Sequence, residues 1–252
     1  MQTRRFFALV AGAAMLLPVT GAVAADAPAE TATPDPVLVQ VVGGDWRTPE
    51  AKARDANRHP VEALTFWGLK PGMTILEVQP GAQSWWTEIL APYAQRTGGK
   101  FYVTGPDLSN PELPEGARKS RAAFEARYGA KPDLYGKIDV VNWGAKSAPL
   151  PKDTFDFILT ARSVHGWMGQ PGMAEKTFKE FYDALKPGGI LALEQHRANP
   201  GPQDPKAATG YVTEDHVIGL AKQAGFTLAA KSELNANPKD TKDHPFGVWT
   251  LP

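Results

Sequence analysis

Two histidines and an arginine follow neighbouring predicted strands and are well suited to proton and anion chemistry. Arg162 and His165 come just after the predicted strand 155–160, and His196 follows the predicted strand 190–193. Because the carboxyl ends of parallel strands meet at one edge of a sheet, the three side chains are expected at the mouth of one ligand cleft. A neutral histidine can take a proton from a hydroxyl, amine or thiol, and an arginine can hold an anion. For each residue the alternative is a hydrogen bond that ties loops together.

A turn of small and constrained residues lies upstream of these groups. The apolar segment 74–78 runs into Pro80, Gly81 and Ala82, which allow a ligand to approach the backbone. Ser84 then suits the N-cap of a helix, whose N-terminus favours electron-rich groups. The next predicted strand ends at Asp107, where a carboxylate can bind a ribose. The alternative for Asp107 is a turn residue that bonds its own backbone.

Strands and helices alternate along the chain and must position these residues. Predicted strands end near residues 78, 107, 143, 160 and 193, and two more cover 226–231 and 247–251. Predicted helices lie between most of them, and 49–67 predicts two short helices separated at Pro60. This alternation favours a mostly parallel sheet with helices on both faces, in one domain. No helix separates the last two strands, so one of them is expected to be antiparallel.

The first 24 residues are typical of an export signal. Residues 1–5 are basic, 6–17 are apolar, and 22–24 form a small-x-small cleavage site. The segment 3–7 resembles a twin-arginine signal. We therefore expect a signal peptide at 1–24, a flexible lead-in at 25–44 and one domain at 45–252. The expected location is periplasmic or secreted, with no stable membrane anchor after cleavage.

Composition excludes several classes of protein. Lys+Arg and Asp+Glu number 27 each, so the chain has no bulk positive field for nucleic acid. Cysteine is absent, which excludes a disulfide framework. The histidines, His244 included, lack the close helical spacing of a metal site, so no metal is predicted. The sequence does not indicate an oligomeric state.

Several segments together resemble class I S-adenosylmethionine-dependent methyltransferases. They are Leu76-Glu77-Val78, Gly105-Pro106-Asp107 and the Leu-Lys-Pro-Gly-Gly run at 185–189. Segments at 54–60, 87–93, 164–165 and 243–250 are similar to an uncharacterised exported branch of that superfamily. The resemblance covers 45–252. It implies a Rossmann-like α/β fold with seven strands, the last one antiparallel, and S-adenosylmethionine as the cofactor.

The resemblance also implies roles for individual residues. Glu77 would orient the turn or the amino-acid end of the cofactor, and its alternative role is to cap backbone N–H groups. Asn142 and Trp143 would lie beside the adenine, although a core position is the alternative for Trp143. Thr160 would lie at the ligand edge of its strand.

The glycine-rich turn departs from the pattern of the superfamily. Gln79, Gly81 and Gln83 stand where three glycines are typical, so only the middle glycine is kept. The side chain of Gln83 would either crowd the cofactor or replace a backbone contact through its amide. Cofactor contacts are expected from Gly81, Ala82 and Gln83.

The leading hypothesis is a methyltransferase that acts on a small molecule. The alternative is an inactive, methyltransferase-like binding protein of the periplasm, because S-adenosylmethionine is made in the cytoplasm. The two glutamines of the turn fit either hypothesis. A nicotinamide-dependent oxidoreductase is disfavoured, because Ser84 and Trp86 follow Gly81 where that fingerprint needs glycines.

Overall fold

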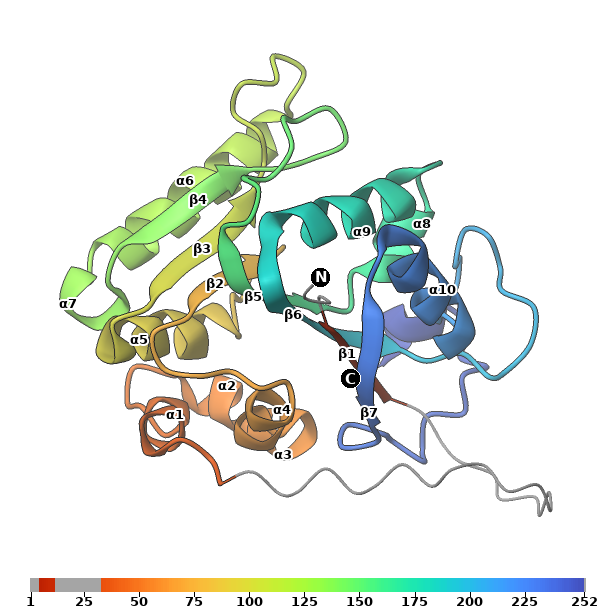
Figure 1. Cartoon of the computed structure of the whole chain (residues 1–252), viewed down its shortest axis with the longest axis horizontal. Helices are drawn as coiled ribbons and strands as arrows, with labels where there is room; N and C mark the ends of the chain where they lie inside the picture. The colour runs from red at the N-terminus through yellow and green to blue at the C-terminus, as the bar shows by residue number, and fades with distance from the viewer. Residues whose placement is uncertain (1–4, 12–32, 252) are drawn as a thin grey trace.

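A seven-stranded sheet forms the centre of the molecule (Figure 1). The computed structural model describes residues 5–11 and 33–251. Its strands have the order β4-β3-β2-β5-β6-β1-β7, and all their pairings are parallel. The strands are β1 Arg5–Ala11, β2 Thr74–Val78, β3 Lys100–Gly105, β4 Ile138–Asn142, β5 Phe155–Ala161, β6 Leu185–His196 and β7 Thr227–Ser232. The predicted Rossmann-like α/β class is confirmed.

Alternate residues of the central strands pack against two different layers of helices. Ile75, Phe157 and Ala192 belong to a buried cluster with residues of α1, α4, α5, α6 and α7. Because successive side chains of a strand point to opposite faces, the fully apolar strands need helices on both sides. The helices of this layer are α1 Pro36–Val42, α4 Pro60–Phe66, α5 Thr87–Thr97, α6 Glu115–Gly129 and α7 Pro132–Tyr135.

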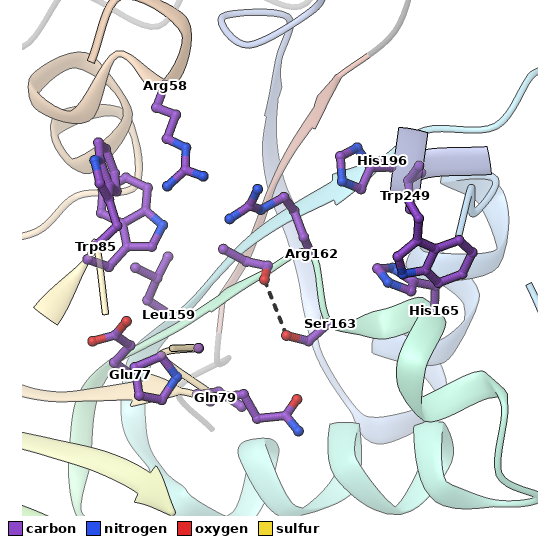
Figure 2. A pocket seen from close by; sticks show the side chains of 16 residues that line it. Arg58, Glu77, Gln79, Trp85, Leu159, Arg162, Ser163, His165, His196 and Trp249 are labelled. Atoms are coloured by element: carbon purple, nitrogen blue, oxygen red, sulfur yellow. Dashed lines mark hydrogen bonds between the residues drawn. The ribbon is translucent and has the colours of Figure 1, made fainter. Parts of the chain in front are cut away.

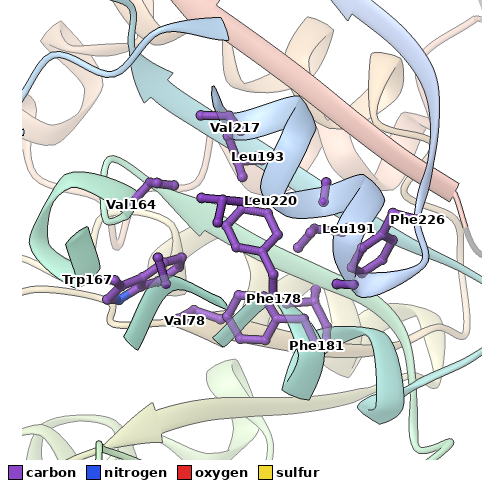
Figure 3. Packing of buried hydrophobic residues seen from close by; sticks show 14 of the residues in the cluster. Val78, Val164, Trp167, Phe178, Phe181, Leu191, Leu193, Val217, Leu220 and Phe226 are labelled. Carbon is purple, nitrogen blue, oxygen red and sulfur yellow. The ribbon is translucent and has the colours of Figure 1, made fainter. Parts of the chain in front are cut away.

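The opposite face carries the second layer. Phe178 and Phe181 of α9 are completely buried against Leu191 and Leu193 of β6 (Figure 3). Their spacing of three residues places both rings on one side of the helix. The helices of this layer are α8 Val164–Met168, α9 Met173–Ala184 and α10 Glu214–Ala224.

A helix forms within the segment that the sequence analysis predicts as a flexible lead-in. Residues 36–42, expected in the flexible lead-in, form α1, where Asp35 accepts a hydrogen bond from the Val37 N–H. Leu38 and Val41 are buried, because their spacing places both on the face that meets the core. The expected lead-in boundary at residue 44 is therefore wrong.

Residues 49–66 form three helices before β2, where the sequence predicts two. They are α2 Pro49–Ala53, α3 Asp55–Arg58 and α4. The break between α3 and α4 falls at His59, which has a φ of 41°. A residue before proline disfavours the right-handed helical conformation, so the chain reorients at this position.

The prediction of an antiparallel last strand is wrong for the described residues. Residues 247–251 were expected as a strand, but Gly247–Thr250 forms a 3₁₀ helix. The Val248 N–H donates to the Thr209 carbonyl, 2.9 Å away. A Cβ on Gly247 would overlap that same carbonyl, so the close approach requires glycine. This contact holds the C-terminal segment against the loop before α10, outside the sheet.

The place between β6 and β7 is taken by β1, which lies within the predicted signal peptide. Its pairing with β6 extends from Arg5↔Ile190 to Ala11↔His196, and its pairing with β7 begins at Arg5↔Thr227. Signal cleavage stays a prediction, and it would remove this strand. Across the described residues, no helix has both the length and the apolar character needed to span a bilayer.

Deleting residues 1–24 is expected to loosen β7, because β1 is its only hydrogen-bonding neighbour among the described strands. Hydrogen–deuterium exchange of full-length protein and of residues 25–252 should show faster exchange of the amides in 227–232 of the shorter chain. The peptide that contains β2 serves as the control and should exchange equally in both. Equal protection of β7 would contradict the role of β1.

Candidate functional site

Two adjoining cavities open at the carboxyl edge of the sheet, beside the point where the strand order reverses between β2 and β5. One has a volume of about 330 Å³ and is lined by residues that include His165 and His196; we call it the histidine cavity. The other, of about 570 Å³, lies against α6 and is called the α6 cavity. Gln79, Pro80 and Gly81 line both. The turn after β2 is therefore the wall between them.

Gln79 takes the backbone conformation of the glycine that it replaces. Its φ is 52°, and its N–H donates to Thr104 Oγ1 at 2.8 Å. Its side-chain Oε1 accepts from Trp167 Nε1 at 3.0 Å. A left-handed conformation costs a non-glycine residue about 1 kcal/mol. The two hydrogen bonds offset that cost and direct the amide of Gln79 towards Trp167.

Gly81 presents open backbone to both cavities. It has a φ of 69°, and a Cβ built on it would meet no atom within 4 Å. The space in front of its Cα is therefore free for a ligand. Ala82 lines the α6 cavity beside it.

Gln83 does not crowd either cavity. Its side chain is exposed, and Oε1 accepts from Arg54 Nη1 at 2.7 Å. The residue is absent from the lining of both cavities. The predicted contact between Gln83 and a cofactor has no support in this geometry.

Glu77 lies in the wall of the histidine cavity, at the end of β2 (Figure 2). Thr87 Oγ1 donates to its Oε2 at 2.6 Å. Burial raises the pKa of Glu77 to about 8, and the Thr87 hydrogen bond opposes the rise. The carboxyl group is thus mostly protonated at neutral pH and can donate a hydrogen bond to a ligand.

Asp107 organises its own loop. Its Oδ1 accepts from the Ser109 N–H at 2.9 Å and from Ser109 Oγ at 2.6 Å. Hydrogen bonds from the side chains of Ser109 and Ser147 hold the pKa of Asp107 below its usual value. The α6 cavity is lined by the preceding residue, Pro106, and not by Asp107. The geometry favours the turn role over the predicted ribose contact.

Of the three other residues predicted to contact the cofactor, one lines a cavity and two line neither cavity. Trp143 lines the α6 cavity, and its Nε1 donates to Glu180 Oε2 at 3.0 Å within the core. Asn142 is exposed and accepts a short hydrogen bond from Arg121. Thr160 is buried and lines neither cavity.

The inner face of α6 supplies walls that the sequence analysis missed. Arg121, Phe124 and Tyr128 line the α6 cavity. Their spacing of three and four residues places them on one face of the helix. This helical spacing is the sequence pattern from which they could have been predicted. Arg121 reaches across the cavity, where its Nη1 donates to the Pro106 carbonyl at 2.8 Å.

All three residues predicted to carry chemistry lie in the histidine cavity (Figure 2). The ring centroids of His165 and His196 are 6.3 Å apart, and Arg162 lies near both. The sequence analysis missed Arg58, whose guanidinium lies over Trp85, 4.6 Å from the ring centroid. It also missed Trp249, which packs edge-on against His165 at 5.7 Å.

Both histidines of the cavity are neutral at pH 7. Burial, with a further contribution from the positive charge of Arg162, lowers the pKa of His196 to about 4. Burial also lowers the pKa of His165. In residues 33–251 no cluster of three His, Asp or Glu side chains suits a metal ion. His244 pairs with Asp240 at 3.3 Å.

The parallel sheet with cavities at its switch point defines a Rossmann-like protein, a fold in which ligands bind at that edge. Residues 78–193 match the family model described as a methyltransferase domain. The chain is 26% identical over 145 residues to the demethylmenaquinone methyltransferase of Lysinibacillus sphaericus. That match covers 56% of this chain and 52% of the relative, so the chain spans about half the length of the curated relative.

A solved structure shows the same fold. An S-adenosylmethionine-dependent methyltransferase from Aquifex aeolicus matches with a TM-score of 0.50 and 22% identity, over 77% of this chain and 90% of that one. A structure from Galdieria sulphuraria, described as a sarcosine dimethylglycine methyltransferase, matches with a TM-score of 0.49 and 17% identity. The match covers 71% of this chain and 64% of that one. Residues 78–193 are thus similar to a methyltransferase domain, and the match to the Aquifex structure shows the same Rossmann-like fold. The exported branch stays a prediction.

Replacing Glu77 with Gln should change how stability depends on pH. The pKa of Glu77 is about 8 in the folded protein and near 4.5 when unfolded. The unfolded chain therefore releases this proton first, and the wild type loses stability as pH rises from 4.5 towards 8. The Glu77→Gln variant lacks this loss, which is on the order of 4 kcal/mol across that range. Urea unfolding of both proteins across that range measures it, and parallel curves would contradict the protonated state.

Proposed function

We propose that the protein transfers a methyl group from S-adenosylmethionine to a small molecule. The observation that carries the proposal is the pair of cavities that meet at the Gly81 turn. A two-substrate transfer needs two ligands held side by side with their reacting groups in contact. The two cavities adjoin at residues 79–81, which supports placing the two ligands side by side there.

The α6 cavity fits the cofactor. Its apolar walls, Val103, Phe124, Val140 and Trp143, suit a planar base. The open Cα of Gly81 allows close approach of the backbone, and the protonated carboxyl of Glu77 offers a donor from the adjoining cavity. Bound S-adenosylmethionine supplies an electrophilic methyl group on a sulfonium. The protein orients the partners and excludes water.

The histidine cavity suits the acceptor. Its volume of about 330 Å³ matches a small molecule, and Trp85, Trp86 and Trp249 give it aromatic walls. The Lysinibacillus relative is named for demethylmenaquinone, but it matches only about half of this chain. We therefore propose the reaction type and a small acceptor. A periplasmic site of action remains an expectation from residues 1–24.

The alternative of an inactive binding protein rested partly on the two glutamines of the turn. The side chain of Gln79 bonds Trp167, and that of Gln83 bonds Arg54. Neither removes the space in front of Gly81. The glutamines therefore do not favour loss of cofactor binding.

Calorimetric titration with S-adenosylmethionine, S-adenosylhomocysteine and NAD tests the cofactor assignment. We expect heat with the first two and none with NAD. Gly81→Val should weaken S-adenosylhomocysteine binding at least about tenfold, because its side chain fills the open space and strains the left-handed backbone. Gln83→Ala is the matched control in the same turn, and its affinity should stay within about twofold of the wild type.

The same titration separates the competing functions. No heat with either sulfur ligand from folded protein would contradict the proposal. Binding without methyl transfer to any of a broad set of small molecules would favour the inactive form.

A further inference from the structure

Two arginines of different elements face one another across the histidine cavity. Arg58 extends from the end of α3, and Arg162 extends from the end of β5 (Figure 2). The Arg58 side chain is half-buried, whereas Arg162 is exposed at the mouth. Among the described residues, neither guanidinium makes a hydrogen bond or an ion pair. Burial and then the charge of Arg162 lower the pKa of Arg58 to about 10, which shows that the two cations repel each other.

The acids near these arginines do not neutralise both of them. Asp55 forms a two-pronged ion pair with Arg47, with both distances 2.7 Å. Glu77 is mostly protonated at neutral pH, since burial raises its pKa to about 8. Glu194 interacts with both arginines, and burial raises its pKa as well. Even a fully ionised Glu194 leaves two cations facing one carboxylate.

A buried amide fixes the tautomer of His165. The Gln195 carbonyl oxygen accepts from the Val164 N–H at 3.2 Å, and its NH₂ group donates to the Gly210 carbonyl at 3.1 Å. These backbone partners determine which end of the amide is the donor. The same NH₂ group lies 3.0 Å from His165 Nδ1, so Nδ1 must accept. The proton of the neutral ring therefore sits on Nε2, which can only donate.

His196 is a weak base in the same cavity. Burial, Arg162 and His165 together lower its pKa to about 4. A base of that strength holds a transferred proton poorly near neutral pH. The cavity therefore combines four donors, Arg58, Arg162, His165 and the protonated carboxyl of Glu77, with no strong proton acceptor.

We infer that the histidine cavity is an oxyanion subsite, which binds the acceptor as a small planar acid whose ionised oxygen lies between Arg58 and Arg162. Trp85, which stacks on Arg58, lies against the planar part, and His165 and Trp249 bound the opposite side of the cavity (Figure 2). The acid loses its proton to solvent water, and the positive field of the two guanidinium groups favours the ionised form, so no protein base is needed. The inference rests on the proposed function only in treating this cavity as the acceptor site.

The probe for this subsite is 4-nitrophenol, whose phenol and phenolate forms absorb at different wavelengths. It is titrated into protein saturated with S-adenosylhomocysteine, at a pH where the free probe is mostly protonated. The wild type should bind it with the phenolate spectrum. Arg162→Asn and Arg58→Gln should each weaken binding at least about tenfold and reduce the phenolate signal. Asparagine tolerates the left-handed φ of 58° at position 162.

Matched controls separate a loss of charge from a loss of fold. Arg96→Gln removes an exposed arginine that stacks on Trp46, away from the cavity, and should leave probe binding unchanged. Nitrobenzene, which cannot ionise, should bind the wild type and both cavity variants equally. Thermal melting and affinity for S-adenosylhomocysteine report whether each variant is folded. The wild-type spectrum tests the inference even if one variant does not fold.

Three results would overturn the inference. The first is a bound probe that keeps the phenol spectrum, and the second is equal affinity for the probe in the wild type and the arginine variants. The third is competition between the probe and S-adenosylhomocysteine, together with loss of S-adenosylhomocysteine binding in both arginine variants. The last would assign the arginines to the cofactor. Phenolate binding in a protein that does not bind S-adenosylhomocysteine would instead contradict the proposed function and leave the oxyanion subsite standing.

Discussion

The reversal of strand order between β2 and β5 determines where this protein can hold ligands. From β2 the chain moves outward through β3 and β4, and from β5 it moves the other way to β6. The helical connections leave towards opposite sides of the sheet, so nothing covers the edge at the turn 79–81. Both cavities open at this place and share its backbone. The position of the site is thus a consequence of topology, and its chemistry depends on which side chains reach it.

Much of the fold and part of the site were predictable from local patterns. Buried strands read as apolar runs, and α9 shows its rings at helical spacing, because these patterns depend on the local period alone. Arg162, His165 and His196 were predictable because strand ends of a parallel sheet converge. Arg58 was not, since α3 lies about a hundred residues before β5 and its place depends on how the helices pack.

At two positions a local contact competes with the pattern that the sequence shows. Asp107 stands where a ribose ligand is typical, but Ser109, two residues away, offers a nearby donor pair. Residues 247–251 have the apolar character of a strand, yet the Thr209 carbonyl holds Val248 outside the sheet. Sequence patterns report average preferences, whereas these two outcomes depend on single hydrogen bonds.

The turn after β2 shows that a glycine can be needed for its conformation or for its lack of a side chain. At position 79 only the left-handed φ is required, and a glutamine supplies it because Thr104 and Trp167 bond its backbone and its amide. At position 81 the space itself is required, since any Cβ there would point into the region that both cavities share. The first glycine of the motif is therefore replaceable in this fold, whereas glycine at position 81 leaves its Cα open to both cavities.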